Sequence, residues 1–557
     1  MAPLADDPRP HVAMIVANDV SADTRVRKMA HDLAASGLRV SVLGVSKTAR
    51  REDLSLGMAT VTLLPVGDRL RTRRALASRL TNRHQIAHEI SIRRARFYAY
   101  QRDVNAEIAW LRSDYFRDRA NRNEEQNAKA RERLHRRAQR ERATDDARLI
   151  GRLRNGLTRS LDEYRKSSQK RREARMEARF RRSEDDLNRR LDRRHESYLR
   201  AEGTLKSRMI EATETGDSDN WQRALPELHD YEVAFGPALD ALDVDVIHAQ
   251  DVHLLGVAAR AASRARARGL STKLVYDAHE YIQGLAPPRP VKAWSSLESE
   301  YIGRADAVIT VAPTIARMLQ EDYDLAGLPT VVMNIPAVGA TPARALRDVV
   351  GLGESDLLLV YSGGLDATRG VHTLVIALAQ LPDAHLALVS KAETVYTNEL
   401  DQIAREGGYS DRLHFAPFVE PQNVVGYLSS ADVGVHTIVS GPINHEVTLP
   451  NKVFEYMHAR LPIVISDCKA MSNLVESLGV GKAFVSEDPL SLAEVLEEVI
   501  EHRAEYRRIY ADSDVLNMYS WTTQRARLLG VYSDLLGSSF SLEAIEGEAL
   551  PSLAIVT

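Results

Sequence analysis

Short apolar segments alternate with segments of helical length along most of this chain. In the N-terminal half, the apolar segments that predict strands are residues 12–18, 39–45, 60–66, 244–250, 273–279, 307–313 and 330–336. In the C-terminal half they are residues 357–363, 385–390, 413–418, 432–438, 462–467 and 483–486. Because parallel strands need a crossover between them, this alternation is typical of βαβ units. The sequence therefore predicts an α/β fold with two doubly wound, Rossmann-like domains and a ligand cleft at the carboxyl ends of their strands.

A basic segment interrupts the alternation. Residues 71–210 contain no proline, and about 40 Lys and Arg against about 21 Asp and Glu give them a charge of roughly +19, although the whole chain carries −3. Apolar side chains step by three or four residues along two parts of it: Phe97, Tyr100, Val104, Ile108, Leu111 and Tyr115, then Met176, Phe180, Leu187 and Leu191. We expect two long helices with a turn near residues 151–156, forming an inserted α-helical hairpin or coiled coil.

Three roles remain open for this insert. Its arginine-rich faces suit an anionic membrane surface. Its heptad-like patches suit homo-oligomerisation or a protein partner. A solvated spacer is the ordinary explanation of a charged run. We expect no nucleic acid partner, because no zinc finger, recognition helix or RNA-binding motif accompanies the charge.

These features divide the chain into five parts. Residues 1–70 and 216–340 are expected to form the first domain, and residues 71–215 the insert. Residues 341–520 are expected to form the second domain, after a linker near residues 336–345. Residues 521–540 form a C-terminal helix, and residues 541–557 are expected to be a flexible tail.

Composition indicates a cytoplasmic location, which becomes peripheral at the inner face of the membrane if the insert binds lipid. No run reaches the roughly 18 apolar residues of a membrane span, and the N-terminus lacks the apolar core of a secretory signal. The single cysteine, Cys468, excludes an internal disulfide. We expect Cys468 to be a small buried residue rather than a nucleophile.

The string LPNKVFEYMHARLPIVISD, residues 449–467, carries the clearest chemical signal. It predicts a helix from Pro450 and a strand over residues 463–466, since proline suits a first helical turn. Lys452 and Glu455 lie three residues apart, on one face near the positive end of the helix dipole. A cation and a carboxylate there suit a ligand with phosphates and hydroxyls, such as a nucleotide sugar. The alternative is a solvated pair on a surface helix.

Several strings together resemble the GT-B glycosyltransferases, specifically the retaining enzymes of glycosyltransferase family 4. They are SGGLDATRGVHTL, ADVGVHTIV, the string at residues 449–467, YSWTTQRARLLGVYSDLL with Trp521, and NDVSADTRVRKMAHDLAASGLRVSVL. The resemblance covers about residues 10–66 and 221–537. It implies a hexosyl- or N-acetylhexosaminyl-transferase that moves a sugar from a nucleotide-sugar donor to a glycan, lipid-linked or cell-envelope acceptor with retention. It also implies no cofactor and no metal.

The resemblance assigns donor-side residues. Glu455 is similar to the second glutamate of the family's pair, which holds donor hydroxyls, and Lys452 would lie near the diphosphate. Arg369 stands where the family usually has a lysine, while Gly363 and Gly364 allow close backbone approach. Donor contacts are also expected from Leu449, Asn451 and Asp467.

The sequence departs from the family pattern at three positions. Gly364 replaces the usual arginine, and Gln250 replaces a frequent histidine. Val447 stands at the place of the first glutamate, with Glu446 one residue away. We expect the role of that glutamate to pass to Asn444 or to backbone amides.

Acceptor-side candidates follow strands of the first domain. His279, Glu280 and Asp251 lie at predicted strand ends, where cleft residues belong, although an ordinary polar turn explains them as well. We expect His279 to be a catalytic residue, together with Glu455, Lys452 and Arg369. Arg25 or Lys28 could meet an anionic acceptor, with a solvated helix face as the alternative.

Two other functions stay open at this point. One is a GT-B sugar-nucleotide epimerase, and the other is a degenerate, non-catalytic GT-B scaffold that acts through the coiled-coil arm. The base and sugar of the donor, the acceptor and the linkage depend on loop shape, so motifs do not define them.

Overall fold

The computed structural model describes residues 8–48, 50–67, 148–214, 219–285, 289–336, 344–390, 395–537 and 553–555, with further helical residues between 89 and 136. Its contacts divide the chain into two units, residues 1–88 with 206–557, and residues 89–205. The first unit contains two separate β-sheets and holds the candidate site.

Nine described strands form the sheet of the N-terminal domain, in the order β15-β3-β4-β2-β1-β5-β6-β7-β8. The strands are β1 (His11–Ile15), β2 (Arg39–Val45), β3 (Glu52–Leu56), β4 (Ala59–Leu64), β5 (Val246–Gln250), β6 (Lys273–Ala278), β7 (Ala307–Thr310), β8 (Thr330–Val331) and β15 (Leu553–Ile555). The pairs from β4 to β8 are parallel, as predicted. β3 and β15 were not predicted, and both pair antiparallel at the edge.

Helices connect and cover these strands. They are α1 (Thr24–Ala35), α5 (Trp221–Ala224), α6 (Leu228–Asp240), α7 (Val252–Ala267), α8 (Val291–Tyr301) and α9 (Pro313–Tyr323). The side chains of β1 are buried along its whole length, because helices cover both faces of a doubly wound sheet. The carboxyl ends of β5 and β6 are adjacent, since Gln250 is paired with Asp277.

The C-terminal domain has six described strands, all parallel, in the order β11-β10-β9-β12-β13-β14. They are β9 (Leu357–Ser362), β10 (Ala384–Ser390), β11 (Leu413–Pro417), β12 (Val433–His436), β13 (Ile463–Ser466) and β14 (Gly481–Phe484). Its helices are α10 (Leu346–Val349), α11 (Val371–Ala377), α12 (Val395–Gly407), α13 (Val424–Leu428), α14 (Ile443–Val447), α15 (Asn451–His458), α16 (Lys469–Ser477), α17 (Pro489–Glu501), α18 (Arg503–Asp512) and α19 (Val515–Met518). Cys468 lies buried after β13, as expected.

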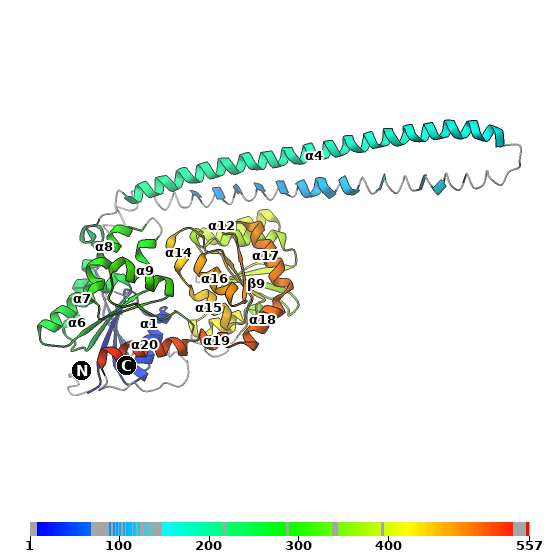
Figure 1. Ribbon diagram of the computed structural model, residues 1–557. Helices are drawn as coiled ribbons and strands as arrows, with labels where there is room; N and C mark the ends of the chain where they lie inside the picture. The colour runs from blue at the N-terminus through cyan, green and yellow to red at the C-terminus, as the bar shows by residue number, and fades with distance from the viewer. Residues whose placement is uncertain are drawn as a thin grey trace. The chain divides into compact units, whose positions relative to one another are not determined.

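The last long helix, α20 (Trp521–Leu536), returns to the N-terminal domain and packs beside α1 (Figure 1). Trp521 Nε1 donates to Asp32 Oδ2 at 2.6 Å, and Arg525 Nε donates to the same oxygen at 2.9 Å. Residues 541–557 were expected to be a flexible tail, but Leu553–Ile555 form β15 against β3. For these three residues the expectation is wrong.

The second unit is an antiparallel pair of helical arms. Its long helix α4 runs from Arg148 to Glu214, so the turn predicted near residues 151–156 is wrong. A glycine costs a helix only about 1 kcal/mol, which does not end a long one. The described residues of the other arm, between 89 and 136, are also helical. No helix in the described part of the chain is both long and apolar enough to cross a membrane.

Candidate functional site

The Lys452–Glu455 pair lies at the start of α15. The helix begins at Asn451, one residue later than predicted, with Pro450 preceding it in an extended conformation. Lys452 Nζ lies 2.9 Å from Glu455 Oε2 and 3.1 Å from Oε1. Their side chains are 20% and 11% exposed, so this is not the solvated surface pair of the alternative interpretation. The helix therefore holds a largely buried ion pair near its N-terminus, where the helix dipole is positive.

The loop after β9 approaches Lys452 closely. Gly363 has φ +150°, and a Cβ there would lie 3.5 Å from Lys452 Cε. The carbonyl of Gly364 accepts a hydrogen bond from the hydroxyl of Tyr361 at 3.0 Å, while space is open around its Cα. Neither glycine position therefore crowds the Lys452 side chain.

Gly370 fixes the position of Arg369. It has φ +65°, and a Cβ would lie 2.1 Å from the carbonyl oxygen of Thr437, which no side chain could tolerate. The hydroxyl of Thr437 donates to the carbonyl of Arg369 at 2.8 Å. The Arg369 guanidinium is 43% exposed and lies 3.7 Å from Asp366, so it remains accessible to an anion.

His436, at the end of β12, lies near several positively charged side chains. Its side chain is 1% exposed, and both ring nitrogens lack a hydrogen-bond partner among the described residues. Burial, together with repulsion from Arg369, Lys452 and His445, lowers the pKa of His436 to about 3. Arg369 and Lys452 are far apart in sequence, but the positive charges of both act on His436. A negatively charged ligand beside these two side chains would therefore be stabilised.

The positions that depart from the family pattern have structural roles. Glu446 accepts from the backbone amides of Gly441 at 2.9 Å and Lys469 at 3.0 Å, the second of which is the first residue of α16. Asn444 Oδ1 accepts from the backbone amide of Tyr281 at 3.1 Å and links the two domains. In this conformation both Glu446 oxygens and Asn444 Oδ1 thus already accept backbone hydrogen bonds, and Val447 is buried.

The other donor-side candidates separate. Asn451 lines a pocket together with Glu455. Leu449 is 8% exposed and belongs to the hydrophobic core, so its side chain offers little surface for a donor contact. Asp467 is exposed at the end of β13 and accepts from the backbone amide of Ser486 at 3.2 Å.

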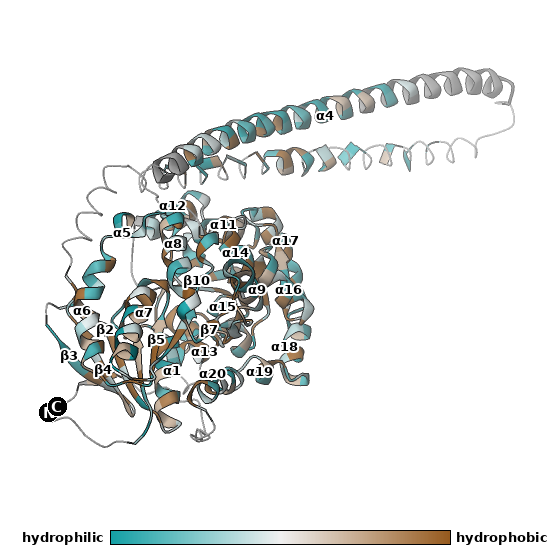
Figure 2. Ribbon diagram, turned by 60° about the vertical axis from the view of Figure 1, so that its left-hand side comes forward, coloured by the Kyte–Doolittle hydropathy of each residue, from teal (hydrophilic) through white to brown (hydrophobic). Residues whose placement is uncertain are grey.

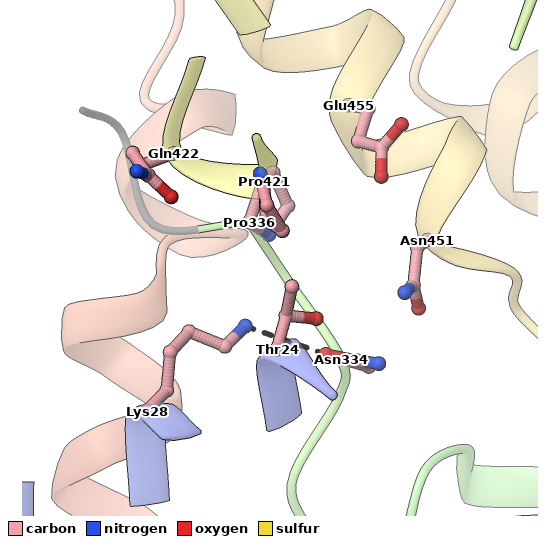
Figure 3. Close-up of a pocket in the computed structure, with 8 residues that line it drawn as sticks. All are labelled: Thr24, Lys28, Asn334, Pro336, Pro421, Gln422, Asn451 and Glu455. Atoms are coloured by element: carbon pink, nitrogen blue, oxygen red, sulfur yellow. Dashed lines mark hydrogen bonds between the residues drawn. The ribbon is translucent and has the colours of Figure 1, made fainter. Parts of the chain in front are cut away.

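The pocket lies between residues of both domains (Figure 3). Its lining residues are Thr24, Lys28, Asn334, Pro336, Pro421, Gln422, Asn451 and Glu455. Lys28 Nζ donates to Asn334 Oδ1 at 3.3 Å and lies 4.1 Å from the ring centroid of Trp521. Sequence reasoning missed Pro421 and Gln422, although they closely follow β11 at its carboxyl end.

Arg25 does not meet an acceptor, which corrects its predicted role. Its side chain is 2% exposed and forms a bidentate ion pair with Asp277. The interpretation as a solvated helix face also fails, because Arg25 and Lys28 are both buried.

His279 and Asp251 lie at the carboxyl ends of β6 and β5. His279 Nε2 lies 3.1 Å from Gln250 Oε1 and 3.4 Å from Asp277 Oδ2, and 22% of its side chain is exposed. Burial lowers the pKa of His279, but the carboxylates of Asp277 and Asp251 outweigh it, so the net shift is upward. Asp251 has φ +65° and accepts from the amide of Val252 at 2.7 Å, which starts α7.

Glu280 is a partly exposed side chain that pairs with Arg289 at 2.7 Å. Burial lowers the pKa of His445 in α14; Arg369 lowers it as well, whereas Glu280 raises it. His445 therefore lies within electrostatic reach of an acceptor-side and a donor-side candidate.

Two doubly wound domains with a terminal helix that crosses back to the first define the GT-B class. The family model for Glycosyl transferases group 1 matches residues 356–502, and the model for Glycosyltransferase Family 4 matches residues 185–334. The chain belongs to the GT-B glycosyltransferases that resemble family 4.

Similar proteins include a D-inositol 3-phosphate glycosyltransferase of Xylanimonas cellulosilytica, 24% identical over 251 residues. That alignment covers 42% of this chain and 58% of the relative, so the chain spans just over half the length of the curated protein it matches. The structure of sucrose-phosphate synthase from Thermosynechococcus elongatus has a TM-score of 0.56 at 14% identity, covering 95% of this chain and 99% of that one. The structure of Anabaena Alr3699/HepE in complex with UDP has a TM-score of 0.44 at 21% identity, covering 56% and 84%.

Proposed function

We propose that this protein transfers a sugar from a nucleotide-sugar donor to a glycan or cell-envelope acceptor, with retention of the anomeric configuration. The observation that supports this most is the convergence of Arg369 and Lys452 on His436, beside the Lys452–Glu455 pair and an interdomain pocket. The matches to glycosyltransferase family models favour transfer over the epimerase and scaffold alternatives.

In this proposal each donor-side residue takes a distinct part of the donor. Lys452 and Arg369 bind the diphosphate, and Arg369 has the planar fork that suits two phosphate oxygens. Glu455 keeps lone pairs beyond those that face Lys452, and these accept from donor hydroxyls. The nucleoside enters the pocket between Asn451 and Gln422.

The reaction then needs mainly positioning and charge stabilisation. The bond from the anomeric carbon to the diphosphate breaks as the acceptor oxygen bonds to the same face of that carbon. The acceptor proton passes to the departing diphosphate, whose negative charge is stabilised by Lys452 and Arg369. We propose that these two cations make an added metal unnecessary. The acceptor enters from the side of His279 and Glu280.

A thermal-shift screen of nucleoside diphosphates and their common sugars, in buffer with EDTA, tests the donor site. A ligand at 100 times its dissociation constant stabilises a protein by about 2.7 kcal/mol, which is readily measured. We expect one base to shift the wild type, and Lys452→Met and Glu455→Gln to reduce the shift by at least about half.

The control is Lys482→Met, because Lys482 and Glu498 form another Lys–Glu ion pair of the same domain, on its exposed surface. Its shift should equal that of the wild type. Absence of any shift in the wild type, or equal losses in all three variants, would contradict the assignment. Transfer from the identified donor to candidate acceptors, with the product's anomeric configuration determined by NMR, then tests the activity.

A further inference from the structure

The apolar seam of the helical hairpin is already occupied by the hairpin itself. Val104 and Ile108 pack against Leu187, and the ring of Tyr115 stacks on Phe180 at 4.7 Å between centroids. Further along, Phe97 stacks on Tyr198 at 4.9 Å, and Arg94 pairs with Glu202 at 2.6 Å in a buried position. These contacts hold the seam side chains within the hairpin, whereas Trp110, Phe116 and Leu199 of the two arms stay exposed.

The opposite face of α4 carries a regular row of arginines. Arg182, Arg189, Arg193 and Arg200 each follow a seam residue by two positions, after Phe180, Leu187, Leu191 and Tyr198. Two residues turn an α-helix by about 200°, so each arginine points away from the seam. Arg171 and Arg175 continue the same line, and all six side chains are exposed. We call this set the arginine row.

The row is straight and mostly not neutralised. From Arg171 to Arg200 it extends about 44 Å at 1.5 Å per residue. Arg189 pairs with Asp186 at 2.6 Å and Arg200 with Glu196 at 3.8 Å, whereas the other four have no ion pair with a described carboxylate. Figure 2 shows the described part of α4 as mainly hydrophilic.

We propose that the arginine row docks the protein on an anionic lipid bilayer. A straight row on a rigid helix matches a flat surface of phosphates, which arginines bind through charge-assisted hydrogen bonds. A nucleic acid duplex curves away from such a row, and the row has no aromatic side chain on which single-stranded bases could stack. Each basic residue held near an anionic membrane raises the affinity of the protein for that membrane about fivefold.

Flotation of the full-length protein with lipid vesicles tests this proposal. The vesicles contain phosphatidylcholine alone or with roughly one third phosphatidylglycerol, at about 0.1 M salt, where the Debye length is about 10 Å. Binding should require phosphatidylglycerol and decline steeply at higher salt. The triple variant Arg182→Gln, Arg189→Gln and Arg193→Gln should weaken binding at least about thirtyfold.

A charge-matched control separates the row from net charge. Arg179→Gln, Arg181→Gln and Arg190→Gln remove three exposed arginines from the flanks of the same helix. Each triple variant breaks one short surface ion pair, Arg189–Asp186 or Arg181–Glu177. Glutamine keeps a high helix propensity, and circular dichroism checks that both variants stay helical.

The control should lose less than about fivefold in affinity. Equal losses in the two triple variants would overturn the proposal, as would equal binding to pure phosphatidylcholine. Release of the protein from vesicles by a stoichiometric amount of duplex DNA would instead identify nucleic acid as the preferred partner.

Discussion

Arg25 and Asp277 form a bidentate ion pair inside the N-terminal domain, with Nε 2.8 Å from Oδ2 and Nη2 2.7 Å from Oδ1. The two side chains are 2% and 0% exposed, and Arg25 also donates to the carbonyl of Val332 at 2.6 Å. Burial disfavours the ionised carboxylate, but Arg25 and His279 outweigh it and hold the pKa of Asp277 well below its usual range. The pair connects α1, β6 and the chain after β8 beneath the acceptor-side candidates.

Removal of the negative partner should be costly. Asp277→Asn leaves the Arg25 guanidinium buried without a counter-charge, and we expect the free energy of unfolding at neutral pH to fall by about 3–5 kcal/mol. Chemical denaturation measures this loss. The control is Asp53→Asn, which breaks the exposed pair with Arg51 and should change stability by no more than about 1 kcal/mol. Similar small losses in both variants would show that the buried pair contributes little.

Glu298 should make stability depend on pH. It is buried and accepts hydrogen bonds from the hydroxyls of Tyr276 at 2.5 Å and Tyr323 at 2.7 Å. Burial raises its pKa from 4.5 to about 7. Because the pKa of Glu298 is higher in the folded than in the unfolded state, its protonated carboxyl stabilises the fold. This stabilisation is fully present below pH 4.5 and is lost as pH rises through about 7.

We therefore expect the Glu298→Gln variant, whose side chain stays neutral, to become more stable than the wild type as pH rises. The difference in free energy of unfolding should grow from near zero at pH about 4.5 to about 3 kcal/mol at pH about 8. Denaturation curves at several pH values measure it. A difference that is constant with pH would show that Glu298 is ionised in the folded protein throughout this range.

Gly370→Ala should damage both the fold and the donor site. The new Cβ would lie 2.1 Å from the carbonyl of Thr437, at a φ of +65° that alanine adopts poorly, so the loop carrying Arg369 must shift. We expect a loss of at least about 2 kcal/mol in stability and weaker nucleotide binding. Gly530→Ala is the control, because nothing lies within 4 Å of its Cβ position on α20, and it should be neutral or slightly stabilising. An unchanged melting temperature in Gly370→Ala would refute the predicted clash.

Arg369→Ala should weaken binding of the nucleoside diphosphate by about tenfold or more, because a charge-assisted hydrogen bond to phosphate is lost. Binding of the corresponding nucleoside should not change. Calorimetric titration of both ligands separates the two effects. Arg405→Ala removes an exposed arginine paired with Asp401 on α12 and should leave both affinities intact. Equal weakening of nucleoside and nucleotide would place Arg369 away from the diphosphate.

Local patterns in the sequence predicted local structure well. β2 lies over residues 39–45 and β13 over residues 463–466, as their apolar runs predicted. Lys452 contacts Glu455 because side chains three residues apart lie on the same face of a helix. β3 was missed because it is only partly buried and lacks a continuous apolar run.

Contacts between distant segments were not predictable in the same way. The charge of Arg25 suggested solvent or an anionic ligand, and nothing near it in sequence indicates Asp277, which lies 252 residues away. Glu446 has the residue type expected of a donor ligand, but both of its carboxylate oxygens already accept hydrogen bonds from the backbone amides of Gly441 and Lys469. Gln422 of the C-terminal domain lines the pocket together with Asn334 and Pro336 of the N-terminal domain, which are distant in sequence.

The return of α20 to α1 has a consequence for biosynthesis. Asp32 precedes its hydrogen-bonding partners Trp521 and Arg525 by 489 and 493 residues, so it is translated long before them, and the edge strand β15 follows them. The packing of the first domain to emerge therefore stays incomplete until the second domain has been synthesised. A nascent chain stalled before Trp521 would expose the apolar surface of α1, which makes it a natural client for chaperones during synthesis.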